Sequence, residues 1–269
     1  MLRFDLYRLA ARLPAFKGKS RLVGWLTKVL FPQQAFRLRS GISMILDPVE
    51  WLQYELLVHE EAEPLTSALM GRLLRPGDAF VDVGCHVGYH SLLARSFVGI
   101  SGRVVAVDPQ PYNAERTMAN WALNGFSNLV VYVGALGSQG ETVSLVQQPV
   151  TDRARLSLLD QGGNQHRARF AVPVYRLDAI LGREGLRNVR LLKIDTEGYE
   201  LQVLGGAGDA LSNIENVILE LLPDQIAGAG ALIELLKYQH RMQLSTVDGR
   251  AWAPGQPLPE NNLWASRGA

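Results

Sequence analysis

The feature that most constrains the fold of this chain is a series of short apolar segments, each followed by a segment with helical spacing. The expected strands are residues 79–83, 103–107, 129–133, 190–195 and 216–222. The expected helices are residues 89–97, 111–123, 199–211 and 225–238. Strands that alternate with helices form βαβ units, so this α/β pattern predicts a mostly parallel sheet that helices cover on both faces. The length of 269 residues is ample for one such domain with an extension.

Residues 1–74 are predicted to form an N-terminal extension of helices and a hairpin, and residues 75–269 the main domain. Residues 1–30 contain seven Lys and Arg against one acid, with leucines at helical spacing. This basic amphipathic pattern fits either a helix on an anionic membrane surface or a helix packed on the domain. An alternating run at 36–46 predicts a hairpin, and residues 48–74 have helical spacing with Pro64 at a helix start.

Composition narrows the classes of function. The net charge of +1, from 27 basic and 26 acidic residues, argues against a nucleic-acid partner. The single cysteine, Cys85, excludes an intramolecular disulfide and a cysteine-based structural zinc site, which favours a cytoplasmic location. No apolar stretch approaches the length of a membrane-spanning helix.

The segment most informative about function is a strand, a glycine loop and a helix that begins at residue 79. The strand reaches Asp82, the chain turns at Gly84, and the helix begins just after Gly88. The spacing GxxxG differs from the GxGxxG of dinucleotide-binding loops, and no Gly-Lys-Ser/Thr of a P-loop follows. The loop therefore indicates a smaller ligand with a nucleoside and a zwitterionic tail, such as S-adenosylmethionine.

The next two strands supply further parts of such a site. Asp108 ends a strand about 20 residues beyond the loop, where a carboxylate can accept both ribose hydroxyls. Ala135 lies in the small-residue turn 134–137, where an adenine ring could lie against backbone. Open α/β sheets bind ligands at the carboxyl ends of their strands, so we expect these features to form one site.

Residues 140–174 depart from the strand–helix alternation. Two short alternating runs, 142–146 and 169–174, flank a polar middle that contains Arg153, Arg155 and Arg167. We interpret this excursion as an acceptor-binding element whose arginines suit an acidic acceptor, with a solvated basic loop as the alternative. Residues 243–247 and 262–266 are expected to close the sheet as a pair of strands.

Several segments resemble, in the same order, the FkbM family of S-adenosylmethionine-dependent methyltransferases. They are Val81-Asp-Val-Gly-Cys-His-Val-Gly-Tyr-His, Ala135-Leu-Gly, Arg176-Leu-Asp, Leu192-Lys-Ile-Asp-Thr-Glu-Gly-Tyr-Glu, Val203-Leu-Gly-Gly-Ala and Ile218-Leu-Glu. The resemblance implies a class I methyltransferase, with a doubly wound, Rossmann-like sheet of seven mostly parallel strands. It also implies S-adenosylmethionine as cofactor, S-adenosylhomocysteine as product, and O-methylation of acceptors such as macrolides and sugars.

The chain departs from the family loop, which reads Asp-Val-Gly-Ala-Asn-x-Gly. Cys85 and His86 stand at the Ala and Asn positions, although His86 can still make a hydrogen bond. His86 and His90 have the spacing of a helical metal pair, but no third ligand is evident in the sequence, so no metal is expected.

Asp195 and Glu197 are the predicted catalytic residues. Methyl transfer to an alcohol needs a placed acceptor and a group that removes the proton, and both carboxylates follow the fourth strand, next to the glycine loop. Asp195 could instead bind the methionine amine of the cofactor. A structural alternative is that Asp195 or Thr196 caps the next helix.

The residues predicted to bind the cofactor are Glu55, Asp82, Gly84, His86, Gly88, Asp108, Ala135 and Asp195. Glu55 is included because family members carry an acid at a similar place, and Glu220 is a further, weaker candidate. The alternatives to a small-molecule or sugar O-methyltransferase are an RNA or protein methyltransferase and a catalytically silent nucleoside-binding protein.

Overall fold

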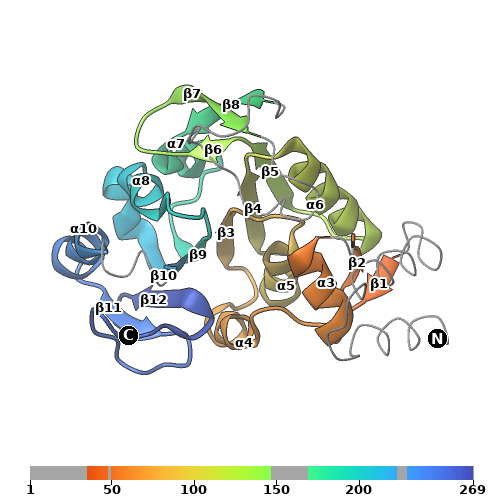
Figure 1. Cartoon of the computed structure of the whole chain (residues 1–269), viewed down its shortest axis with the longest axis horizontal. Helices are drawn as coiled ribbons and strands as arrows, with labels where there is room; N and C mark the ends of the chain where they lie inside the picture. The colour runs from red at the N-terminus through yellow and green to blue at the C-terminus, as the bar shows by residue number, and fades with distance from the viewer. Residues whose placement is uncertain (1–34, 48–49, 147–168, 223–228, 269) are drawn as a thin grey trace, which may run out of the picture.

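The computed structural model describes residues 35–47, 50–146, 169–222 and 229–268. Its centre is a seven-stranded sheet of order β11-β12-β10-β9-β3-β4-β5 (Figure 1). The strands are β3 (Ala79–Val83), β4 (Arg103–Asp108), β5 (Leu129–Val133), β9 (Val189–Ile194), β10 (Ile214–Glu220), β11 (Gln243–Thr246) and β12 (Asn262–Ser266). Strand β12 is antiparallel to both neighbours, and the pairs from β10 to β5 are parallel. The predicted seven-stranded, mostly parallel α/β fold is therefore confirmed.

Helices cover both faces of this sheet. One face packs against α3 (Trp51–His59), α4 (Pro64–Leu73), α5 (Tyr89–Val98) and α6 (Pro111–Leu123). The other face packs against α7 (Leu177–Arg183), α8 (Glu200–Gly205), η2 (Gly208–Asn213), α10 (Gly230–Ile233) and η3 (Glu234–Gln239). Neighbouring residues of one strand join different cores, as Phe80 and Val81 of β3 do, so the central strands are apolar throughout.

Some predicted helices differ from the structure in their limits. Residues 48–74 contain two helices, α3 and α4, because the chain turns between them with Glu60 and Glu63 at positive φ. The helix expected at 199–211 is divided into α8 and the 3₁₀-helix η2. Helix α7 was not expected, and residues 225–228 of the helix expected at 225–238 lie outside the described residues.

The excursion forms part of a second, three-stranded sheet. Its strands, in the order β6-β8-β7, are β6 (Ala135–Leu136), β8 (Arg169–Tyr175) and β7 (Glu141–Val146). The two runs expected at 142–146 and 169–174 are thus confirmed as strands. Residues 147–168, which carry Arg153, Arg155 and Arg167, lie outside the described residues.

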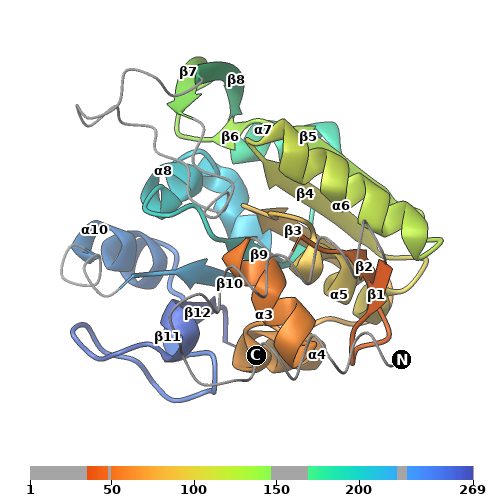
Figure 2. The ribbon, with the colours of Figure 1, turned by 45° about the vertical axis from the view of Figure 1, so that its right-hand side comes forward.

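Residues 35–74 pack on the sheet rather than standing apart from it. The expected hairpin is β1 (Ala35–Arg37) and β2 (Ser43–Ile45). Its backbone amides at Ser43 and Ile45 donate to Asn124, the C-cap of α6, and to Asn120 within α6. Figure 2 shows this hairpin beside the C-terminal end of α6. Leu52 of α3 lines the same cavity as Asp195, the residue that follows β9. Residues 1–34 lie outside the described part, in which no helix is long and apolar enough to cross a membrane.

Candidate active site

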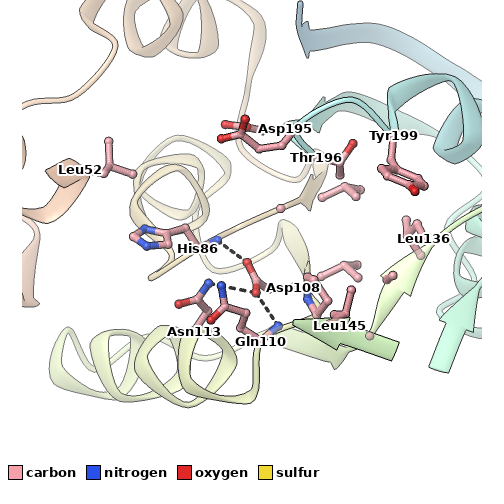
Figure 3. A pocket seen from close by; sticks show the side chains of 17 residues that line it. Leu52, His86, Asp108, Gln110, Asn113, Leu136, Leu145, Asp195, Thr196 and Tyr199 are labelled. Carbon is pink, nitrogen blue, oxygen red and sulfur yellow. Dashed lines mark hydrogen bonds between the residues drawn. The ribbon is translucent and has the colours of Figure 1, made fainter. Parts of the chain in front are cut away.

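A cavity lies at the carboxyl ends of β3, β4 and β9, where Figure 3 shows its lining side chains. His86 and Leu52 are at one end, Tyr199, Leu136 and Leu145 are at the other, and Asp108 lies between them. The second end is apolar and aromatic, which suits a flat ring. The cavity is thus polar in the middle and apolar where a base could lie.

The loop after β3 approaches the end of β9 so closely that only glycine fits. Gly84 has φ +79, and a Cβ there would lie 1.8 Å from the backbone oxygen of Asp195. The backbone amides of Gly84 and Cys85 donate to the Val107 oxygen at 2.8 and 3.1 Å. The loop is therefore held between β4 and β9, with its backbone open to a ligand.

Asp108 is the acceptor at the centre of the polar part. Its carboxylate accepts hydrogen bonds from the backbone amides of His86 (2.9 Å) and Gln110 (2.8 Å) and from Asn113 Nδ2 (3.1 Å). Burial raises its pKa to about 7, although these three donors act in the opposite direction. A carboxylate in this position is suited to ribose hydroxyls, and that role of Asp108 stays a prediction.

His86 is a buried side chain whose ring nitrogens have no hydrogen-bond partner among the described residues. It is 8% exposed, and its Nε2 is 3.5 Å from Oε2 of Glu50, the residue that caps α3. Burial lowers its pKa, which keeps the imidazole neutral, although Glu50 acts in the opposite direction. A neutral imidazole can donate from one nitrogen and accept at the other, so His86 offers the cavity both kinds of hydrogen bond.

Asp195 is paired with a buried cation. Lys193 is 2% exposed, and its Nζ donates to Asp195 Oδ2 at 2.8 Å. Burial tends to raise the pKa of Asp195, but the Lys193 ammonium and hydrogen bonds from Lys193 and Glu220 outweigh it, so the net shift is downward. Asp195 is therefore an ionised and weakly basic carboxylate.

The alternative that Asp195 or Thr196 caps the next helix is wrong. Glu200 instead accepts from the backbone amides of Thr196 and Gly198 and from the Thr196 hydroxyl. Tyr199, the N-cap of α8, makes no side-chain cap bond. Asp195 is thus available to the cavity.

A second cavity of about 860 Å³ adjoins the first and shares Leu52, Asp195 and Glu197 with it. Its lining on the side of α3 and α4 includes Glu50, Glu55, Glu61 and Glu63. Its lining from the sheet edge and the C-terminal part includes Asp195, Glu197, Glu220 and Glu260. The two cavities meet at two carboxylates.

The structure brings most of the predicted site residues together. Those that line the first cavity are Gly84, His86, Asp108, Ala135, Asp195 and Glu197. Asp82 is buried behind it and accepts from Ser91 Oγ at 2.6 Å, Gly88 is the N-cap of α5, and Glu55 lines only the second cavity. The binding roles of all these residues stay predictions.

Other residues of the site were not expected from the sequence. Leu52, Gln110, Asn113 and Leu145 line the first cavity, and Glu50 and Glu63 line the second. Asn113 follows Asp108 closely enough to be a local candidate, but Leu52 and Glu63 reach the site only because α3 and α4 fold over the sheet edge. No group of three or more His, Cys, Asp or Glu in the described ranges is arranged to hold a metal ion.

The strand order, with its one antiparallel strand, and the glycine loop facing Asp108 define a class I S-adenosylmethionine-dependent methyltransferase. The cavity fits that cofactor because it has an open glycine loop, a carboxylate suited to the ribose, an apolar end suited to the adenine, and an imidazole whose ring nitrogens make no hydrogen bond within the described part of the chain. The chain belongs to the FkbM methyltransferase family, whose model, the methyltransferase FkbM domain, matches residues 82–242.

Curated relatives include methyltransferases of several kinds. Methyltransferase 1 of Beauveria bassiana is 27% identical over 66% of this chain and 78% of its own length. The hexuronic acid methyltransferase AglP of Haloferax volcanii is 23% identical over 54% of this chain and 56% of its own length. Protein-L-isoaspartate O-methyltransferase 2 of Archaeoglobus fulgidus is 39% identical over 29% of this chain, and the match spans only 36% of that relative.

Solved structures include a methyltransferase FkbM from Methylobacillus flagellatus. The two proteins are 17% identical, and the match has a TM-score of 0.48. It spans 98% of this chain and 58% of the Methylobacillus chain.

Proposed function

We propose that this protein transfers the methyl group of S-adenosylmethionine to a hydroxyl oxygen of a small-molecule or saccharide acceptor. The observation that carries the proposal is the junction of the two cavities at Asp195 and Glu197. The cofactor occupies the first cavity and the acceptor the second, so the two compounds meet beside two carboxylates. In-line transfer depends on such placement.

When bound, S-adenosylmethionine supplies a methyl carbon that bonds to the acceptor oxygen as its bond to sulfur breaks, with the electron pair left on sulfur. The hydroxyl proton must pass to a base at the junction. Asp195 is a weak base because its negative charge is paired with the ammonium of Lys193. Glu197, a non-glycine residue held at φ +55, is therefore the proton acceptor in this proposal, and Asp195 orients the reactants.

The charge of the second cavity supports an acceptor other than RNA. Eight of its lining residues are Asp or Glu, and carboxylates at this density oppose a phosphodiester backbone. They equally oppose a protein carboxylate, the acceptor that the name of the isoaspartate relatives indicates. A catalytically silent nucleoside-binding protein would bind S-adenosylhomocysteine but release no methylated product, so turnover tests that alternative.

Three further features of the protein are part of this proposal. We propose a cytoplasmic location, a peripheral membrane contact through residues 1–30, and a role in acceptor binding for residues 140–174. The first 34 residues and the arginine-rich middle of the excursion lie outside the described part of the chain.

The chemistry is tested by Glu197→Gln and Asp195→Asn, which keep the side-chain shapes. We expect Glu197→Gln to lower kcat by about a hundredfold to ten-thousandfold while S-adenosylhomocysteine affinity changes little. The assay follows labelled methyl transfer into an extract of the source cells, with calorimetry for the affinity. Glu115→Gln, on the exposed side of α6, is the control.

Two results would contradict this assignment. Full activity of both Glu197→Gln and Asp195→Asn would mean that orientation alone drives the reaction, and full activity of Glu197→Gln alone would assign the proton to another base. A labelled product methylated on nitrogen or carbon would exclude O-methylation.

A further inference from the structure

The loop between β9 and α8, residues 195–199, contributes to the walls of both cavities. Asp195 and Glu197 line both of them, and Thr196 lines the first. The backbone of Asp195 is fixed by the sheet, because its amide donates to the Val83 oxygen at 2.9 Å. The residues that follow lie outside any strand or helix until α8 begins, so another part of the protein must hold them.

The centre of this loop has an unfavourable backbone conformation. Glu197 has φ +55 and Gly198 has φ +109, so two consecutive residues are at positive φ. Glycine tolerates this region, whereas a residue with a Cβ is disfavoured there and persists only where its surroundings fix it. The conformation of Glu197 therefore requires contacts that hold the chain around it.

One carboxyl oxygen supplies such contacts. Oε1 of Glu200 accepts from the Thr196 amide at 3.1 Å, from the Thr196 hydroxyl at 3.0 Å and from the Gly198 amide at 3.0 Å. Thr196 precedes Glu197 and Gly198 follows it, so the three bonds hold the chain on both sides of Glu197. Within the described part of the chain, neither amide donates to a backbone oxygen, so Glu200 is the acceptor that pairs them.

Glu200 is itself held in place by the core. It is the first residue of α8 and is only 3% exposed. Val203 and Leu204 of the same helix are buried in the core. Gly206, which follows the helix, lies so close to Gly137 that an added Cβ would be 2.1 Å from the Gly137 oxygen. The Glu200 carboxylate therefore belongs to an element with little freedom to move.

We propose that Glu200 is a positioning residue, which holds the backbone on both sides of Glu197 and so directs the Glu197 carboxylate to the junction of the two cavities. The inference rests on the proposed function, in which Glu197 accepts the hydroxyl proton. Glu200 lines neither cavity, so it acts through Glu197. A base must lie within hydrogen-bond reach of its proton, and a displacement of about 1 Å costs about a hundredfold in rate.

Two substitutions of Glu200 separate its reach from its charge. Glu200→Gln loses the charge but keeps the length and an oxygen that accepts hydrogen bonds. Glu200→Asp keeps the charge but is one methylene shorter, so it cannot reach all three donors. We expect Glu200→Asp to lower the maximal rate about tenfold to a hundredfold and Glu200→Gln to retain most of it.

The reverse order would overturn the inference. An acid in the first turn also stabilises a helix through its charge, and a charge near Glu197 also affects its basicity. Either of these roles would be kept by Glu200→Asp and lost by Glu200→Gln.

The assay uses methyl-labelled S-adenosylmethionine and dilutions of a small-molecule extract of the source cells, and it measures the labelled product. The dilution series separates the maximal rate from the half-saturating amount of acceptor. Glu115→Asp, on the exposed side of α6, is the matched control for a shortened acid. We expect the S-adenosylhomocysteine affinity of Glu200→Asp, measured by calorimetry, to change little. A loss of affinity as large as the loss of rate would indicate a general change of the site and would contradict a positioning role.

A double variant shows whether the effect passes through Glu197. Glu200→Asp is added to Glu197→Gln, and we expect no further loss of rate, because the group that Glu200 positions is already absent. An equal loss in both backgrounds would overturn the inference and leave the proposed function intact. Full activity of Glu197→Gln by itself would remove the proposed base, and the inference would fail with it.

Discussion

At the scale of single residues, burial determines the chemistry of this site more than residue type does. Asp108 and Asp195 are both carboxylates at strand ends, yet burial raises the pKa of the first to about 7, whereas burial of the second is outweighed by Lys193 and its pKa is lowered. One therefore titrates near neutral pH and the other stays ionised. We therefore expect Asp108, and not Asp195, to make ligand binding depend on pH near neutrality.

S-Adenosylhomocysteine should bind more weakly as the pH falls below about 7. Asp108 is the proposed acceptor for the ribose hydroxyls, and protonation of its carboxyl replaces a charge-assisted acceptor with a weaker neutral one, so protonation competes with the ligand. The affinity should fall by up to about tenfold for each pH unit. Calorimetry between pH 5.5 and 8 measures this, and Asp108→Asn should bind weakly with much less dependence on pH.

The same shift has a consequence for the ligand-free protein. A carboxyl whose folded pKa exceeds its ordinary 3.8 costs stability as the pH rises from about 4 to about 7. Between these pH values, the free energy of unfolding of Asp108→Asn should therefore decline less than that of the wild-type protein. An unchanged pH profile of both binding and stability in the variant would assign the titration to another group.

At the scale of elements, two glycines at the end of helix α7 differ in why glycine stands there: one lies within the helix and the other follows it at positive φ. Gly185 follows the helix at φ +64, its amide donates to the Gly182 oxygen, and the amide of Leu186 donates to the Leu181 oxygen. This is a Schellman ending, and Leu181 and Leu186, the residues whose side chains flank it, are both buried in the same core. Gly182, in contrast, is exposed within the helix, and an added Cβ would meet no atom within 4 Å.

Gly182→Ala and Gly185→Ala should therefore change stability in opposite directions. We expect Gly182→Ala to stabilise the protein by about 0.5–1 kcal/mol, because alanine favours helix. We expect Gly185→Ala to destabilise it by about 1 kcal/mol, because a side chain is disfavoured at positive φ. Urea unfolding of both variants measures this, and equal shifts would contradict the structure of the helix end.

At the scale of the whole molecule, segments near both ends of the described chain line the two cavities of the candidate active site. Glu260 accepts hydrogen bonds from the Leu65 and Thr66 amides and from the Thr66 hydroxyl, and Asn262 donates to Glu63. Helix α3 adds Leu52 to the first cavity. These segments lie outside residues 82–242, the part that matches the family model.

Cofactor binding should therefore protect helix α3 as well as the glycine loop. We expect S-adenosylhomocysteine to slow amide hydrogen exchange in Trp51–His59, because Leu52 contacts the ligand cavity and Glu50 lies beside His86. Exchange in β11, at the far edge of the sheet, is the control and should not change. Protection confined to residues 82–242 would contradict a role for α3 in binding.

Much of the fold was predictable because its signals are local. The apolar runs of β3, β4, β5, β9 and β10 and the helical spacing between them are periodicities of the backbone itself. The limits of α3, α4 and α8 were predicted less well, because turns such as the one at Glu60 and Glu63 depend on long-range packing. Helix α7 is only seven residues long, too short for a clear periodic signal.

The sequence alone determined the alternation of strands and helices, the glycine loop and the position of Asp108, because each depends on neighbours in the chain. Only the tertiary structure decided which side chains line the second cavity. The contact between Thr66 and Glu260 joins residues 194 positions apart, and no local pattern encodes such a pairing. Burial likewise exists only in the folded chain. The ion pair that lowers the pKa of Asp195, the neutral imidazole of His86 and the acidic second cavity therefore follow from packing rather than from residue order.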